Sequence, residues 1–210
     1  MESSSPARAT AFEAAWRESS GRPLLIRFAR AVSGAGETAL SFAVRPEASF
    51  RGFPVEGSML AALIFGTLLG GPCLLLAVAL RSVLVDEPLP GLAMALALLL
   101  AAPTLYLYLR AQALHLTLVL SGKARRSFAA TLRVVGYANG SLAPLLLLPI
   151  AGDLLFLVAG SMAEVSGIRK AHGLRLGEAI AVELVPVSLL LLALGAALIV
   201  AFLGWSQVRS

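Results

Sequence analysis

Basic residues in this chain are gathered into three segments, and pairs of long apolar runs separate those segments. Seven, five and three of the 17 Lys and Arg residues fall in residues 1–57, 110–133 and 169–175, and only Arg81 and Arg209 lie elsewhere. Because basic residues accumulate on the cytoplasmic side of a bilayer, this spacing predicts both the number of membrane crossings and their direction. A chain with this pattern is expected to be a polytopic membrane protein.

The composition agrees with a membrane environment. Hydrophobic residues make up 58% of the 210 residues and charged residues 14%, whereas a soluble domain carries about 25% charged residues. The net charge of +5 is explained by positive cytoplasmic loops, and no basic stripe alternates with aromatic residues. Cys73 is the only cysteine and lies in an apolar run. We therefore expect no nucleic-acid partner, no intrachain disulfide and no thiolate metal site.

Five apolar stretches predict transmembrane helices. They cover residues 59–80, 91–109, 134–152, 154–168 and 179–203. The second stretch could continue to residue 120 as one long tilted helix that reaches into the cytoplasm. The fourth is shorter than the ~18 residues usually required. We count it as a span because only five spans place all three basic segments on one face.

These stretches predict an all-α fold with two parts. Residues 1–57 are expected to form a cytoplasmic tail with amphipathic or interfacial helices, and residues 58–210 a polytopic bundle of five transmembrane helices. The charge pattern orients this multi-pass bundle with the amino terminus in the cytoplasm and the carboxyl terminus outside.

Part of the tail has the pattern of an amphipathic helix. Four apolar residues share a helical face with two arginines beside it: Leu24, Leu25, Phe28 and Val32, and Arg27 and Arg30. Such a basic amphipathic helix can lie in the headgroup region of a bilayer. It can equally pack, partly solvated, on the cytoplasmic face of the protein itself, and the sequence leaves both placements open.

Two motifs in the spans begin and end with glycine, at residues 66–70 and 136–140. Small residues at this spacing let helix backbones approach closely. We expect both motifs to serve packing within the chain, although a homo-oligomer is also possible.

Ionisable residues within the spans are costly in a bilayer, so each needs a partner or a function. Six are expected at one depth, the cytoplasmic leaflet boundary: Arg110, His115, Arg133, Glu164, His172 and Glu183. Tyr137 and Asn139 should lie one to two turns deeper. In one interpretation the two glutamates pair with Arg133, Arg110 or Arg169 and tie the helices together. In the other the cluster lines a cytoplasm-facing cavity for a headgroup or an ion.

The sequence gives little support for an enzyme. Ser161, Ser166, His115 and His172 could nominally form a serine hydrolase, but the spacing of a nucleophile elbow or a zinc protease is missing, and both histidines are predicted at the surface. None of the 19 glycines belongs to a phosphate-binding motif. We therefore expect no catalytic residues, no cofactor and no metal site.

Three motifs resemble the Yip-one (Ypt-interacting protein) domain family. Residues 127–139 read SFAATLRVVGYAN, and in that family a similar loop enters a span through an arginine, followed by a Tyr-Ala step and a proline, here Pro144. Residues 166–174, SGIRKAHGL, resemble the family's turn between its last two spans. Arg45-Pro46 with Phe50 resembles its entry motif.

The resemblance covers residues 28 to 203. It implies five spans, a cytoplasmic amino terminus and an exterior carboxyl terminus, in agreement with the charge pattern. Eukaryotic members of the family bind Rab GTPases and act in vesicle trafficking. The composition here, rich in arginine, alanine and leucine, resembles bacterial members instead.

We therefore expect a non-enzymatic membrane-organising or trafficking-like scaffold that recruits a protein partner or anionic lipid at its cytoplasmic face. The candidate lipid or partner loop contains Lys123, Arg125 and Arg126. The candidate polar layer consists of Arg133, Tyr137, Asn139, Glu164, Arg169, His172 and Glu183. The alternative is a small transporter or channel that uses Glu164, Glu183 and Asn139, near the helix-breaking Pro144 and Pro186.

Overall fold

The computed structural model describes residues 10–18, 24–51 and 57–188. These residues form helices, and no strand occurs among them, so the all-α class is confirmed for the described part. The elements are α1 (Ala11–Glu18), α2 (Leu24–Val44), α3 (Pro46–Arg51), α4 (Met59–Leu84), α5 (Leu92–Leu96), the π-helical turn η1 (Ala97–Ala101), α6 (Ala102–Leu120), α7 (Phe128–Leu142), the 3₁₀ turn η2 (Ala143–Leu147) and α8 (Gly152–His172). A further helical stretch covers residues 176–188.

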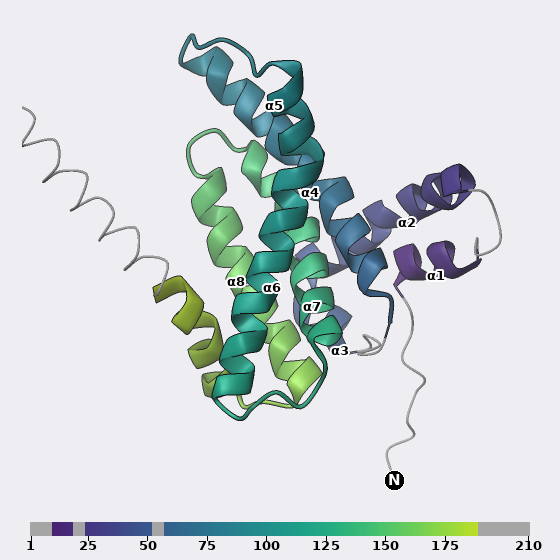
Figure 1. Ribbon diagram of the computed structural model, residues 1–210, viewed down its shortest axis with the longest axis vertical. Coiled ribbons are helices and arrows are strands. Elements are labelled where there is room, and N and C mark those ends of the chain that lie inside the picture. Colours follow the sequence, from purple (N-terminus) through teal and green to yellow (C-terminus); the bar gives the residue numbers. More distant parts are fainter. Residues whose placement is uncertain (1–9, 19–23, 52–56, 189–210) are drawn as a thin grey trace, which may run out of the picture.

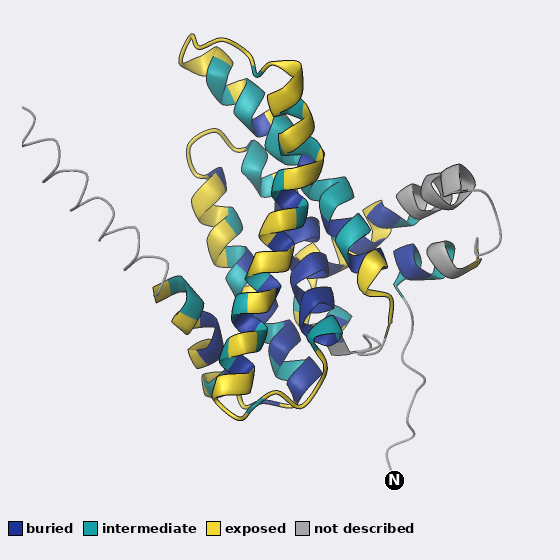
Figure 2. Cartoon of the chain, viewed as in Figure 1, coloured by how far each residue is buried: buried dark blue, intermediate teal, exposed yellow. Residues whose placement is uncertain are grey.

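The helices α4, α6, α7 and α8 run side by side along the long axis, and α1 and α2 extend from the side of this group (Figure 1). The central member is α7, since nearly every residue of it is buried (Figure 2). Its neighbours expose apolar side chains to the outside. The bundle therefore has a packed core around α7 and an apolar exterior.

Two described helices are long and apolar enough to cross a bilayer, Met59–Leu84 and Leu92–Leu120. Only 22% and 11% of the residues in their most apolar windows are buried, which is unlike the core helices of a soluble protein. The second helix is continuous to Leu120, so the predicted continuation of the second apolar stretch to residue 120 is observed as a helix. The side chain of Ser58 caps α4 by accepting a hydrogen bond from the Ala61 amide at 3.1 Å.

A close contact joins α4 to the π-helical turn. Proline lacks an amide hydrogen, so Pro103 cannot donate to the Leu99 carbonyl as an α-helix requires. That carbonyl oxygen instead lies directly against Gly71 of α4, where any Cβ would collide with it. The irregular turn thus lets the two long helices approach.

The later elements differ from the predicted spans 134–152 and 154–168. The helix α7 ends at Leu142 and gives way to η2, because Pro144 cannot continue the α-helical hydrogen bonding. In turn α8 is longer than predicted, and Gly173 ends it in the left-handed conformation with a φ of 63°. The predicted span 179–203 is helical as far as residue 188, and residues 189–203 lie outside the described part.

The tail packs on the side of the bundle. Phe12 of α1 meets Phe65 of α4 edge-on with ring centroids 5.3 Å apart, and the Phe12 amide donates to the Thr38 hydroxyl of α2 at 3.1 Å. Phe42 of α2 stacks on Tyr137 of α7 at 5.5 Å. The second half of α2 therefore packs on the protein itself, against the side of α7 and not on an end of the bundle. The side chains of residues 24–33 lie outside the described part.

The glycine motifs lie where α4 crosses α7. A Cβ on Gly136 would stand 2.7 Å from the Ala62 carbonyl oxygen, and one on Gly140 would stand 2.9 Å from the Gly66 Cα. The two backbones are therefore in contact, which confirms packing within the chain at this crossing.

Replacing Gly136 by alanine is expected to destabilise the bundle by about 1–3 kcal/mol, because the added methyl group forces α4 and α7 apart. Gly36 of α2 has no atom within 4 Å of an added Cβ, so its alanine variant should be as stable as the wild type or more stable. Thermal unfolding of both variants in detergent compares the two positions. Equal stability of the two would contradict the close crossing.

Candidate functional site

The structure brings a buried charged cluster together from three helices. Arg110 of α6 donates to Glu164 of α8 from Nε at 3.2 Å and from Nη2 at 3.0 Å. The same Nη2 also forms an ion pair with Glu183, which lies in the helical stretch 176–188. The side chains of Arg110, Glu164 and Glu183 are only 13%, 1% and 4% exposed. One guanidinium therefore holds two carboxylates inside the bundle.

Asn139 adds α7 to this cluster. Its Nδ2 donates to Glu164 Oε1 at 2.5 Å and to the Val135 carbonyl at 2.9 Å, and its Oδ1 accepts from the Tyr106 hydroxyl at 3.4 Å. Both oxygens of Glu164 are thus hydrogen-bonded. Asn139 therefore lies at the level of Glu164, whereas the sequence placed it one to two turns deeper. Of the three arginines considered as partners of the glutamates, Arg110 is the one that pairs with them.

An apolar cavity of about 250 Å³ ends at the cluster. Residues of α4, α6, α7, η2 and α8 line it, and Tyr106 and Asn139 are its polar members. The rest of the lining consists of Gly, Ala, Pro, Leu and Phe. A path for hydrated ions needs polar lining, so this cavity suits apolar contents.

Arg133 belongs to a second buried site, which corrects its predicted place in the polar layer. It forms an ion pair with Glu13 of α1, and these side chains are 0% and 2% exposed. Tyr137 lies beside this pair, packed between Phe42 and Phe65 at 5.5 and 4.8 Å. Sequence reasoning missed Glu13, because nothing in the local pattern of the tail shows that it reaches the core.

His172 belongs to a third site and is buried, whereas the sequence predicted it at the surface. The Thr131 hydroxyl lies 3.1 Å from His172 Nε2 and 3.1 Å from His115 Nδ1, so it links the two imidazoles.

The predicted single layer is in fact divided along the helices. Glu164 and His172 are eight residues apart in α8, which corresponds to about 12 Å along the axis. The charged cluster and the histidine pair therefore lie at different levels. The sequence analysis placed His172 in the same layer as Glu164 because it ended the fourth span at residue 168, whereas α8 continues to His172.

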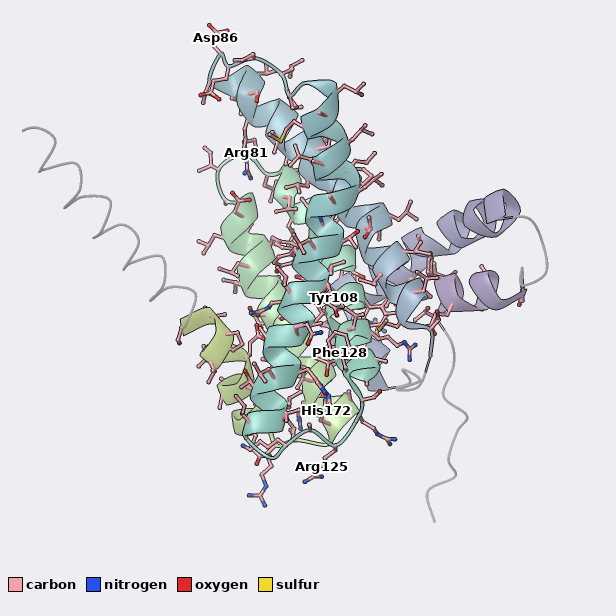
Figure 3. All side chains as sticks on the ribbon, viewed as in Figure 1. Arg81, Asp86, Tyr108, Arg125, Phe128 and His172 are labelled. Atoms are coloured by element: carbon pink, nitrogen blue, oxygen red, sulfur yellow. The ribbon has the colours of Figure 1, made fainter. Side chains whose placement is uncertain are left out.

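The basic residues Lys123, Arg125, Arg126 and Arg175 lie in two loops, 121–127 and 173–175, at one end of the bundle. Figure 3 shows Arg125 and His172 toward the end opposite Arg81 and Asp86. Lys123 pairs with Glu178 at 3.3 Å, and Arg125 Nη1 donates to the Gly173 carbonyl at 3.4 Å. The first contact joins the loop 121–127 to the helical stretch 176–188, and the second joins it to the loop 173–175.

Arg169 does not join the charged cluster either. Its Nη1 lies 3.7 Å from Glu47 Oε1 of α3, and Lys170 Nζ lies 3.8 Å from the same oxygen. Both basic side chains are partly exposed. The predicted polar layer is therefore distributed over four separate sets of contacts.

Comparisons with protein-family models, curated proteins and solved structures find no match. Among the described residues, no group of three or more His, Cys, Asp or Glu side chains could hold a metal ion.

Proposed function

We propose that this chain is a non-enzymatic, multi-pass inner-membrane scaffold whose basic end binds anionic lipid headgroups. The lengths of its apolar helices support membrane insertion. The candidates Met59–Leu84 and Leu92–Leu120 have 26 and 29 residues, or about 39 and 43 Å at the rise of an α-helix. The hydrocarbon core is ~30 Å thick, so each can cross it with tilt or with one end outside.

The proposal includes three further membrane crossings, which makes five in all. They are α7 with η2, α8, and residues 179–203. The charges at the two ends support the orientation, with the amino terminus in the cytoplasm and the carboxyl terminus outside. Asp86, Glu87 and the exposed Arg81–Asp153 pair, at 2.8 Å, lie at one end. The basic loops lie at the other, which is the expected cytoplasmic side.

The observation that carries the lipid-binding proposal is the meeting of the loops 121–127 and 173–175. Arg125, Arg126 and Arg175 are exposed there, and the Arg125–Gly173 hydrogen bond holds the loops side by side. Basic residues near an anionic bilayer surface contribute about 1 kcal/mol each to binding. A cluster of this kind at the membrane surface therefore favours anionic over zwitterionic lipid.

Charge reversal tests this proposal. Purified in detergent, the variant Arg125→Glu/Arg126→Glu is expected to bind phosphatidylglycerol at least ~30-fold more weakly than the wild type, since it removes two attractive charges and adds two repulsive ones. Lipid retained through purification is quantified by mass spectrometry.

The matched control is Arg125→Lys/Arg126→Lys, which keeps the charge and should retain lipid normally. Unchanged lipid retention in the glutamate variant would contradict the proposal. Retention that falls equally in the lysine variant would show that the loop structure, and not its charge, is what matters.

The resemblance to the Yip-one family extends the proposal to a protein partner at the same face. Pull-down from the native host with the charge-reversal variant as control tests it.

The alternative, a small transporter or channel, draws on the buried Arg110–Glu164–Glu183 cluster. The apolar lining of the cavity beside Asn139 favours the scaffold. A homo-oligomer is compatible with both.

A further inference from the structure

The buried Arg110–Glu164–Glu183 cluster has an imbalance of charge. Two carboxylates share one guanidinium nitrogen, and all three side chains are largely shielded from solvent. If both carboxylates were ionised, the cluster would carry a net negative charge inside an apolar bundle. Such an uncompensated buried charge is strongly unfavourable.

The two carboxylates differ in their hydrogen bonds. Glu164 accepts from Arg110 at one oxygen and from Asn139 at the other, which suits an ionised group. Glu183 meets Arg110 through Oε1, whereas its buried Oε2 accepts no hydrogen bond from the described residues. An oxygen in this position can carry a proton without losing any existing bond.

The remaining groups around Glu183 fit this assignment. The charged or titratable groups facing it are Arg110 and Tyr106 of α6 and Glu164 of α8, and α8 also brings the Ser161 hydroxyl close. From α7 the cluster receives only the neutral amide of Asn139. Glu164 is a hydrogen-bond acceptor for a protonated Glu183, and the Ser161 hydroxyl can donate to or accept from it.

We propose that the cluster is a proton-binding site, in which Glu183 takes up one proton from water at neutral pH and the Glu164 carboxylate pairs with Arg110. Glu183 is the contribution of the helical stretch 176–188 to the cluster. If Glu183 lost its proton, two negative carboxylates would share the single positive charge of Arg110, and their repulsion would favour separation of the helical stretch 176–188 from α8. Proton binding therefore stabilises the packing of this stretch on the bundle.

Infrared spectroscopy of the full chain in nanodiscs, labelled with ¹³C-carboxyl glutamate, tests the site. A neutral carboxylic-acid band that shifts in D₂O is expected at neutral pH. It should disappear in Glu183→Gln and persist in Glu178→Gln, which changes a partly exposed glutamate of the same helical stretch. Absence of the band in the wild type, or its persistence in Glu183→Gln, would overturn the proposal.

Stability provides a second measurement. Because glutamine mimics the neutral acid, Glu183→Gln should fold and unfold at the wild-type temperature at neutral pH, and lose less stability than the wild type as the pH is raised. Misfolding of this variant would contradict a neutral Glu183. Stabilisation of the wild type by Na⁺ or K⁺ without a carboxylic-acid band would identify a bound cation instead. These outcomes are independent of lipid binding at the basic loops.

Discussion

Replacing Arg110 by methionine is expected to destabilise the bundle by about 3–5 kcal/mol, because it leaves the buried Glu164 carboxylate without its cation. Glu164 is 1% exposed, and Arg110 supplies both hydrogen bonds to its Oε2. The contact between α6 and the helical stretch 176–188 through Glu183 is lost at the same time. Thermal unfolding in detergent, followed by circular dichroism, should show a midpoint lowered by roughly 10 °C.

Removing the charges that Arg110 balances should restore much of this stability. The variant Arg110→Met/Glu164→Gln/Glu183→Gln contains no ion in the cluster, so its cost should be far smaller than that of Arg110→Met alone. Lys123→Met is the matched control, since it breaks the more exposed Lys123–Glu178 pair and should have little effect. A triple variant as unstable as Arg110→Met would show that packing, and not charge, explains the loss.

Replacing Arg133 by methionine is expected to destabilise the protein by a similar ~3–5 kcal/mol, because it leaves the buried Glu13 carboxylate without its cation. The Arg133 side chain is 0% exposed and that of Glu13 2% exposed, so neither can turn to solvent without moving its helix. The pair fastens α1 to α7. We therefore expect Arg133→Met to expose the tail to limited proteolysis within α1 as well as to lower the unfolding temperature.

The variant Glu13→Gln/Arg133→Met removes both charges and should recover most of the loss. Arg81→Met is the control, since the Arg81 and Asp153 side chains are 35% and 66% exposed and surface pairs contribute little. If protease cleavage within α1 were the same in Arg133→Met and in the wild type, the pair would not be what holds the tail.

The long apolar helices could be predicted well. The starts of α4 and of the Leu92–Leu120 helix fall where the uncharged stretches begin, and Ser58 and Pro90 mark them. The predicted stretch 134–152 was less accurate. The mean hydropathy over a window of residues does not show that Pro144 ends an α-helix or that neighbouring helices surround α7.

The candidate site was predicted in part. Glu164, Glu183 and Asn139 could be selected as candidate site residues because placing a polar group in an apolar segment costs free energy. The choice of partner did not follow, because Arg110, Arg133 and Arg169 all looked equivalent along the sequence. Arg110 meets Glu164 and Glu183 across 54 and 73 residues, and Arg133 meets Glu13 across 120.

The sequence by itself determined the helical class, the position of the long apolar helices and the gathering of basic residues into a few loops. These properties depend on the composition of each segment and on its preference for lipid or water. Only the tertiary structure decided that α7 is central, that α1 reaches the core and that Arg110 holds two carboxylates. Those outcomes depend on which helices pack together, and the glycines of α4 and α7 set that packing by allowing the backbones to touch.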